Sequence, residues 1–203
     1  NLDYCHYLDG QSTGLALIWV SADGENKIVV APGANAAFHA RELDLPKVDA
    51  IIAQLEIPQD TIISAARQNE RFLTLNAAPA RPVSRELLDL TDLLVVNEIE
   101  ARAIGPALDD FEGLIATTYG SRGAELSRNG QIIARATSPQ VAAVDTTGAG
   151  DTFTAALTVG LAEGMDPQAA LERACLAAAI SVTRAGAQGS PTLAELAEFS
   201  KGI

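Results

Sequence analysis

Short apolar runs alternate with longer amphipathic segments through the middle of the chain, and this alternation limits the possible folds more than any other feature. Residues 51–55, 72–76 and 93–96 have the composition of buried strands, and residues 58–69 and 84–90 between them have that of helices. Strands separated by helices pair in parallel, because each helix carries the chain back across one face of the sheet. The sequence therefore predicts an α/β fold, in which a mostly parallel sheet is flanked by helices on both faces.

Two hairpins are expected outside this alternating region. Their strands are residues 14–20 with 26–31, and residues 124–128 with 131–135. Asn129-Gly130 is typical of a two-residue turn, and polar residues 21–25 separate the strands of the first pair. Further on, Asp166 followed by Pro167 marks the start of a helix in a C-terminal third that is predicted to be helical.

The composition excludes several classes of protein. A chain of 203 residues with 48% hydrophobic residues is long enough for one well-packed domain. Its net charge of -12 argues against a nucleic-acid partner, and no apolar run approaches the roughly 18 residues of a membrane span. Cys5 and Cys175 lie far apart and do not indicate a disulfide framework. We therefore expect a cytoplasmic protein with no nucleic-acid or membrane partner.

The chemistry is indicated by the stretch from Asp145 to Phe153, with the sequence DTTGAGDTF. Gly148 and Gly150 allow bare backbone to approach a ligand, and an amphipathic helix begins directly after them. Free amides at a helix start form an anion site. A phosphate-holding pocket would gain nothing from the carboxylate of Asp151, whereas phosphoryl transfer to a hydroxyl needs both amide donors and a base.

Other interpretations of this stretch are weaker. Asp151 could simply cap the helix, since aspartate is a favoured capping residue. A dinucleotide-binding GxGxxG motif does not fit, because Phe153 stands where the third glycine would be. The chain also has no GxxxxGK[ST] phosphate loop. The remaining interpretation is a phosphoryl-transfer site of another type.

Residues 145–153 resemble the C-terminal signature of the ribokinase family, the phosphofructokinase-B type of carbohydrate kinases. Further similar segments occur in family order over nearly the whole chain: GANAA (33–37), QLE (54–56), NAAPAR (76–81), NEIEA (97–101), TYGSRG (118–123) and SVTRAGAQGS (181–190). The resemblance implies a ribokinase-like fold in which residues 1–33 form part of a small β lid and residues 34–203 the catalytic core. It also implies that the N-terminal portion of the family fold, which carries most sugar-binding segments, is absent from this chain.

One departure from the family pattern lies between Asn97 and Gly120. This segment is shorter than usual and has room for one helix, at residues 98–104, where the family has two. The nucleotide pocket is therefore expected to differ at this edge.

The resemblance assigns a nucleotide site and a magnesium site. Asn97 and Glu100 match an NxxE motif that orients water around Mg²⁺ and the phosphates, although a solvated helix start is the alternative. The ATP-binding positions that it implies are Asn97, Thr118, Tyr119, Gly120, Ser121, Arg122, Gly123, Gly150 and Cys175. A packing role for Cys175 and an ordinary turn at 118–123 remain open.

The resemblance also implies a K⁺ site and a sugar contact. The matching K⁺ positions, which act mostly through main-chain carbonyls, are Asp145, Thr147, Ser181, Arg184, Gly186 and Ser190. Ser181 and Gly186 could equally be plain helix and loop residues. Glu56 matches a contact to a sugar hydroxyl, with a solvated acid at a strand end as the alternative.

These expectations combine into one reaction. ATP would phosphorylate a primary hydroxyl of a sugar, D-ribose being the expected substrate and D-ribose 5-phosphate the product. Asp151 would take the hydroxyl proton, and the amides of Gly148, Ala149, Gly150 and Asp151 would stabilise the transferring phosphoryl group. The alternatives are another sugar or nucleoside kinase of the family, or a nucleotide-binding fragment without activity. An exposed lid edge favours a homodimer.

Overall fold

A computed structural model describes residues 2–5, 7–20, 26–39, 45–69 and 71–199. Its main sheet has six strands in the order in which they follow along the chain: β3 (Ala50–Gln54), β4 (Phe72–Asn76), β5 (Leu93–Asn97), β6 (Leu114–Thr118), β7 (Ala124–Arg128) and β8 (Gln131–Ala136). The first four strands pair in parallel, whereas β7 and β8 pair antiparallel. The predicted α/β fold with a mostly parallel sheet is therefore confirmed.

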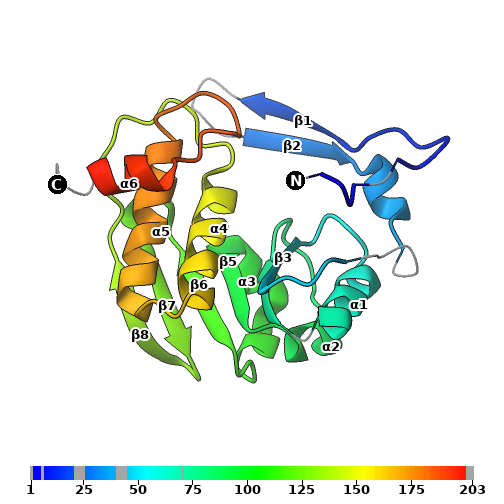
Figure 1. The fold of residues 1–203 in the computed structure, drawn as a ribbon, viewed down its shortest axis with the longest axis horizontal. Helices are drawn as coiled ribbons and strands as arrows, with labels where there is room; N and C mark the ends of the chain where they lie inside the picture. The colour runs from blue at the N-terminus through cyan, green and yellow to red at the C-terminus, as the bar shows by residue number, and fades with distance from the viewer. Residues whose placement is uncertain (1, 6, 21–25, 40–44, 70, 200–203) are drawn as a thin grey trace.

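Helices cover both faces of this sheet (Figure 1). One face carries α1 (Gln59–Asn69), α2 (Arg85–Asp89) and α3 (Glu98–Ile104), and the other carries α4 (Ala149–Ala162) and α5 (Pro167–Ser181), with α6 (Leu193–Phe199) beside α5. Successive strand side chains point to opposite faces, so Leu94 and Val96 of β5 pack toward α1 to α3. Leu93 and Val95 of the same strand pack toward α4 and α5. A strand buried on both sides needs a continuous apolar run, as found at 93–96.

Helices α4 and α5 pack closely because small residues lie between them. A Cβ on Gly160 of α4 would come within 3.1 Å of the Ala170 Cβ in α5. Helix α4 is also joined to the sheet by a polar contact, since the hydroxyl oxygens of Thr158 and Thr74 lie 2.9 Å apart in the core. Helix α4 is thereby fixed against the parallel part of the sheet.

A separate two-stranded antiparallel sheet is formed by β1 (Leu15–Val20) and β2 (Asn26–Ala31). The predicted strands of this first hairpin are confirmed, and the expected turn at 21–25 lies outside the described residues. The chain continues from the hairpin into a short 3-10 helix, η1 (Gly33–Ala37). In Figure 1 the hairpin lies above the main sheet, on the side of the molecule where α4 begins.

The connection from β5 to β6 is short, as expected. It contains α3 followed by η3, a single 3-10 turn at Gly105–Leu108, so the crossover has one α-helix. None of the described helices has the length and apolar character needed to cross a lipid bilayer.

Candidate active site

The start of α4 is built on a left-handed glycine. Gly148 caps the helix with φ 78° and ψ 1°, a conformation that favours glycine. A Cβ at this position would lie 2.6 Å from the carbonyl oxygen of Ala187, so the loop after α5 approaches the backbone here. The glycine is therefore needed both for its own conformation and for this close approach.

Three backbone amides at this helix start are available to an anion. Among the described residues, no protein acceptor is found for the amides of Gly148, Gly150 and Asp151. The Ala149 amide differs from the prediction, because it donates to the carbonyl of Thr146 at 3.2 Å. Free amides at the positive end of a helix attract negative charge.

Asp151 lies in the first turn of α4 and is exposed to solvent. It is not the helix cap, because Gly148 holds that position and no side chain caps the helix. Instead, its Oδ1 accepts a hydrogen bond of 2.8 Å from Nε2 of Gln54, the last residue of β3. The capping alternative is thereby excluded, and Gln54 is a neighbour that the sequence did not indicate.

A pocket of about 270 Å³ opens beside this helix start. The predicted residues that line it are Thr118, Gly120, Ser121, Gly123, Ala149, Gly150 and Cys175. Residues 138–141 and the α5 face at Ala178 and Ala179 line it as well, and the sequence patterns did not assign them. Burial raises the pKa of the Cys175 thiol to about 11, so this wall of the pocket is neutral.

Tyr119 and Arg122 do not line this pocket. Arg122, in the 3-10 turn η4 (Gly120–Arg122), forms an ion pair of 3.0 Å with Glu98. Its guanidinium also lies 5.0 Å from the centre of the Tyr119 ring. The Tyr119 hydroxyl is 3.2 Å from Glu125, and desolvation together with this carboxylate raises the pKa of Tyr119. Both side chains thus bind other parts of the protein.

Asn97 and Glu100 form a capping box at the start of α3. The Asn97 side chain accepts from the Glu100 amide at 2.9 Å, and Glu100 accepts from the Asn97 amide at 2.7 Å. Glu100 is buried, and this burial raises the pKa of its carboxyl, while the hydrogen bonds from Asn97 oppose the rise. The pair is therefore ordered and not a solvated helix start.

The loop after α5 is tied to the segment before α4. Asp145 accepts hydrogen bonds of 2.9 Å from the amides of Thr147 and Gly186, and these bonds lower the pKa of its carboxyl. The hydroxyls of Ser190 and Thr152 lie 2.7 Å apart. The structure thus brings five of the expected K⁺ positions to one junction: Asp145, Thr147, Arg184, Gly186 and Ser190. Ser181 ends α5 next to it, and its carbonyl accepts from the Arg184 amide.

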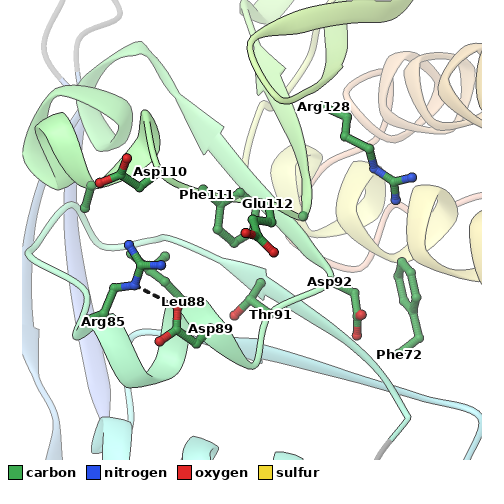
Figure 2. Close-up of a pocket in the computed structure, with 12 residues that line it drawn as sticks. Phe72, Arg85, Leu88, Asp89, Thr91, Asp92, Asp110, Phe111, Glu112 and Arg128 are labelled. Atoms are coloured by element: carbon green, nitrogen blue, oxygen red, sulfur yellow. Dashed lines mark hydrogen bonds and ion pairs between the residues drawn. The ribbon is translucent and has the colours of Figure 1, made fainter.

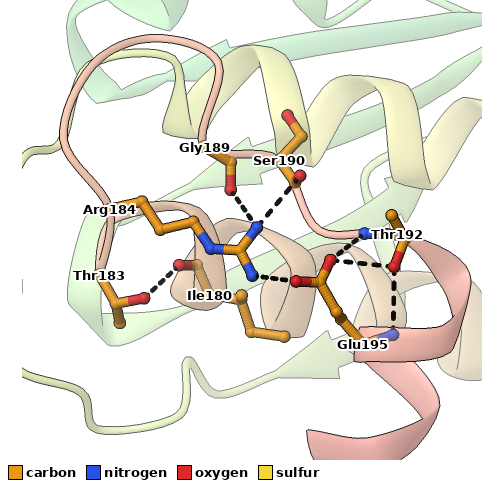
Figure 3. A network of polar contacts seen from close by, with 7 residues as sticks. All are labelled: Ile180, Thr183, Arg184, Gly189, Ser190, Thr192 and Glu195. Atoms are coloured by element: carbon orange, nitrogen blue, oxygen red, sulfur yellow. Dashed lines mark hydrogen bonds and ion pairs between the residues drawn. The ribbon is translucent and has the colours of Figure 1, made fainter.

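Arg184 organises this loop through its side chain (Figure 3). Its Nη1 lies 3.3 Å from the Gly189 carbonyl, and its Nη2 lies 2.5 Å from Oε1 of Glu195. Glu195 also accepts a hydrogen bond of 2.7 Å from the Thr192 amide, and this bond lies at the start of α6. The last helix is therefore linked to the loop that contacts Gly148.

A second pocket, of about 290 Å³, has Gln54, the hydrogen-bond partner of Asp151, in its lining. Gln54, Glu56 and Asn35 supply its polar lining, and residues of β3 and α1 supply apolar walls. Glu56 is exposed and faces this space from the turn after β3. Gln54 and Asn35 lie in two segments that resemble the family, residues 54–56 and 33–37. No sequence motif indicated either of them as a site residue.

A third hollow, of about 550 Å³, lies at the opposite end of the sheet (Figure 2). Asp89, Asp92, Asp110 and Glu112 line it together with Arg85 and Arg128. This excess of carboxylates repels phosphate groups, and ligands of open α/β sheets bind at the carboxyl ends of the strands. We therefore place the functional site at the start of α4.

The described residues offer Mg²⁺ little direct coordination. They contain no group of three or more His, Cys, Asp or Glu side chains that could hold a metal ion. Mg²⁺ keeps most of its waters and binds substrate phosphates, so one or two carboxylates are sufficient. Both Glu100 oxygens accept from Asn97 and retain lone pairs for water, which fits contact through water only.

Comparison with known proteins identifies the class. The family model described as pfkB family carbohydrate kinase matches residues 1–193. The chain belongs to this family, whose members are phosphotransferases with an alcohol acceptor.

Individual relatives agree with this assignment. A ribokinase from Bacillus subtilis is 39% identical over 97% of this chain and 72% of its own length. The crystal structure of a ribokinase from Thermotoga maritima superposes with a TM-score of 0.83 at 33% identity, covering 94% of this chain and 70% of that one. Arabidopsis thaliana ribokinase, solved with ribose and ATP, gives a TM-score of 0.79 at 28% identity over 96% of this chain and 73% of that one.

Proposed function

We propose that this carbohydrate kinase transfers the γ-phosphoryl group of ATP to a primary hydroxyl of a sugar, and that the sugar is D-ribose. One observation carries the proposal: Asp151 is linked to two pockets through the residues beside it. Its neighbour Gly150 lines the first pocket, and its hydrogen-bond partner Gln54 lines the second. A base for phosphoryl transfer must lie where the donor and the acceptor meet. The ribokinase relatives and the solved complex with ribose and ATP support the choice of substrates.

The chain's own groups suit each part of this reaction. The nucleotide would occupy the pocket beside Gly120 and Gly123, and the sugar the pocket beside Glu56. Asp151 would accept the hydroxyl proton as the oxygen attacks. The amides of Gly148, Gly150 and Asp151 would stabilise the negative charge on the transferring group.

We include two cations in the proposal. Mg²⁺ would be held through water by Glu100 and Asn97, and when bound it neutralises charge on the phosphates. K⁺ would bind at the junction of Asp145, Thr147 and Gly186, with Ser181, Arg184 and Ser190 around it. The carboxylate of Asp145 supplies the charge there, and the same junction holds the loop against Gly148.

We propose that residues 1–33 act as part of a lid over the sugar pocket and residues 34–203 as the core. Asn35 of that pocket lies in η1, the short helix after the hairpin, and the Ala34 amide in the same helix donates to the Ser12 carbonyl at 2.8 Å. The hairpin is therefore tied to the edge of the pocket that it would cover.

The substrate is tested with a panel of sugars and nucleosides, in which ADP formation is coupled to a spectroscopic signal. D-Ribose should give the highest kcat/KM. A clear preference for another sugar would change the substrate assignment, and binding of ATP without turnover on any acceptor would indicate a nucleotide-binding protein.

Asp151→Asn tests the role of the base. The substitution keeps the size of the side chain and removes its ability to take a proton. We expect kcat to fall by at least about 100-fold, while the dissociation constant of ATP is nearly unchanged. Calorimetry measures the binding and the coupled assay measures kcat. Turnover close to that of the unchanged protein would remove Asp151 from this role.

A further inference from the structure

Gln54 and Asp151 meet although they are 97 positions apart in the sequence. Gln54 is the last residue of β3 and pairs with Asn76 of β4. The next residue, Leu55, is fully buried, and its amide donates to the Ala78 carbonyl at 2.8 Å. The backbone that carries Gln54 is therefore held by the sheet on both sides of the side chain. Asp151, by contrast, projects from the exposed first turn of α4.

The hydrogen bond has a direction that matters for catalysis. The carboxylate of Asp151 only accepts, so the amide nitrogen of Gln54 faces it and the amide oxygen faces away. The bond occupies Oδ1 at 2.8 Å and limits the rotation of the carboxylate. Among the described residues no donor to Oδ2 is found, so this oxygen is open to accept a proton.

We infer that Gln54 is a positioning residue that orients Asp151 so that Oδ2 meets the acceptor hydroxyl. The inference rests on the proposed function and adds a second side chain to the same site. An exposed carboxylate without this donor would sample several rotamers, and only some of them would reach the hydroxyl. Gln54 also lines the proposed acceptor pocket, so the residue that holds Asp151 belongs to the wall beside which the sugar would bind.

A direct contact between Gln54 and the sugar is the competing explanation. Gln54 and Glu56 line the same pocket, so both are candidates for contact with the sugar. Loss of a sugar contact would lower activity as well. The two explanations differ in whether the effect of Gln54 depends on the carboxylate of Asp151.

The test is a double-mutant cycle on the purified protein with Gln54→Met and Asp151→Asn. Methionine preserves the length of the side chain and removes the donor. We expect Gln54→Met to lower kcat about 10-fold, with the KM for ATP and the unfolding temperature unchanged. In the Asp151→Asn background the same substitution should lower kcat no further, because the oriented base is already lost.

Gln59→Met is the matched control. Gln59 makes two hydrogen bonds, to the Pro82 carbonyl at 3.0 Å and from the Ser84 amide at 2.9 Å, on α1 and away from Asp151. Its substitution should leave kcat unchanged even if it lowers the unfolding temperature.

The outcomes separate the two levels of the proposal. Equal losses of kcat from Gln54→Met in both backgrounds would overturn the positioning role and indicate a direct sugar contact. Full activity of Gln54→Met alone would overturn it too, while leaving the proposed kinase function intact. Absence of kinase activity in the unchanged protein would overturn the proposed function, and the positioning role with it.

Discussion

At the scale of a single residue, position 148 requires glycine for two independent reasons. Its φ of 78° lies in the left-handed region, and its Cα faces the Ala187 carbonyl so closely that a Cβ would stand 2.6 Å from the oxygen. The clash is with backbone, so it cannot be relieved by rotating a side chain. Gly164, at the other end of α4, has the same φ of 78° and open space around it.

This contrast gives a matched pair of substitutions. Gly164→Ala should destabilise the protein by about 1–2 kcal/mol, the strain of a left-handed alanine, and leave catalysis unchanged. Gly148→Ala should cause the same strain and also a clash with the Ala187 carbonyl. The clash should displace the free amides, so we expect kcat/KM to fall at least about 10-fold as well. Thermal unfolding and the coupled assay measure both effects. Equal catalytic effects of the two substitutions would show that the amide geometry does not depend on the loop contact.

Residue by residue, sequence patterns were most informative where the groups of the candidate site are close together in the chain, although the catalytic role of these groups stays a prediction. The stretch DTTGAGDTF contains the glycines, the free amides and the carboxylate within nine residues, so composition and spacing indicated an anion site with a base. Gln54 could not be found in this way, because no pattern shows which strand end meets which helix start. Tyr119 and Arg122 lie inside a matching segment, yet Glu98 and Glu125 bind them away from the pocket.

At the scale of elements, a buried pair of hydroxyls joins α4 to the sheet. Thr158 of α4 and Thr74 of β4 are 1% and 0% exposed, and their oxygens lie 2.9 Å apart. The Thr158 hydroxyl is also 2.7 Å from the Thr154 carbonyl. If either threonine is replaced by an apolar residue, the hydroxyl of the remaining threonine stays buried and loses this hydrogen bond.

We expect Thr158→Val to lower the free energy of unfolding by about 1–3 kcal/mol, because the Thr74 hydroxyl is left unsatisfied. The double variant Thr74→Val/Thr158→Val should cost less than the sum of the single ones, since no orphaned group remains. Thr154→Val is the control: its hydroxyl donates within α4, to the Gly150 carbonyl at 2.8 Å, so its effect should simply add to that of Thr74→Val. Denaturant unfolding measures all of them, and additivity of the Thr74 and Thr158 effects would contradict the coupling.

The helices and strands themselves followed from periodicity. Each predicted strand and helix is present within one or two residues, because the central strands are buried on both faces and the helices have one apolar side. The short 3-10 turns and residues 138–141 were not anticipated. These segments have no repeating pattern, and their place beside the pocket depends on how β8 is joined to α4.

At the scale of the whole molecule, the hairpin leaves an apolar surface uncovered. Leu15, Leu17 and Trp19 alternate along β1, and Val29 pairs with Leu17 on the same face. Their exposed fractions are 57%, 48%, 60% and 57%. Apolar strand faces of this kind indicate an interaction site, and the outer edges of a two-stranded sheet can accept further strands.

We therefore propose that two copies associate through the hairpin, and that the protein is a homodimer at micromolar concentration. Leu17→Lys places a charge in the centre of the apolar face, so it should shift the protein to the monomer while leaving the unfolding temperature of the core unchanged. Ile133→Lys changes a similarly exposed apolar strand residue, 46% exposed against 48% for Leu17, but in β8 of the main sheet. It should not affect association. Sedimentation velocity measures the mass of each variant, and a monomeric unchanged protein, or dimers that resist Leu17→Lys, would exclude the hairpin as the dimer interface.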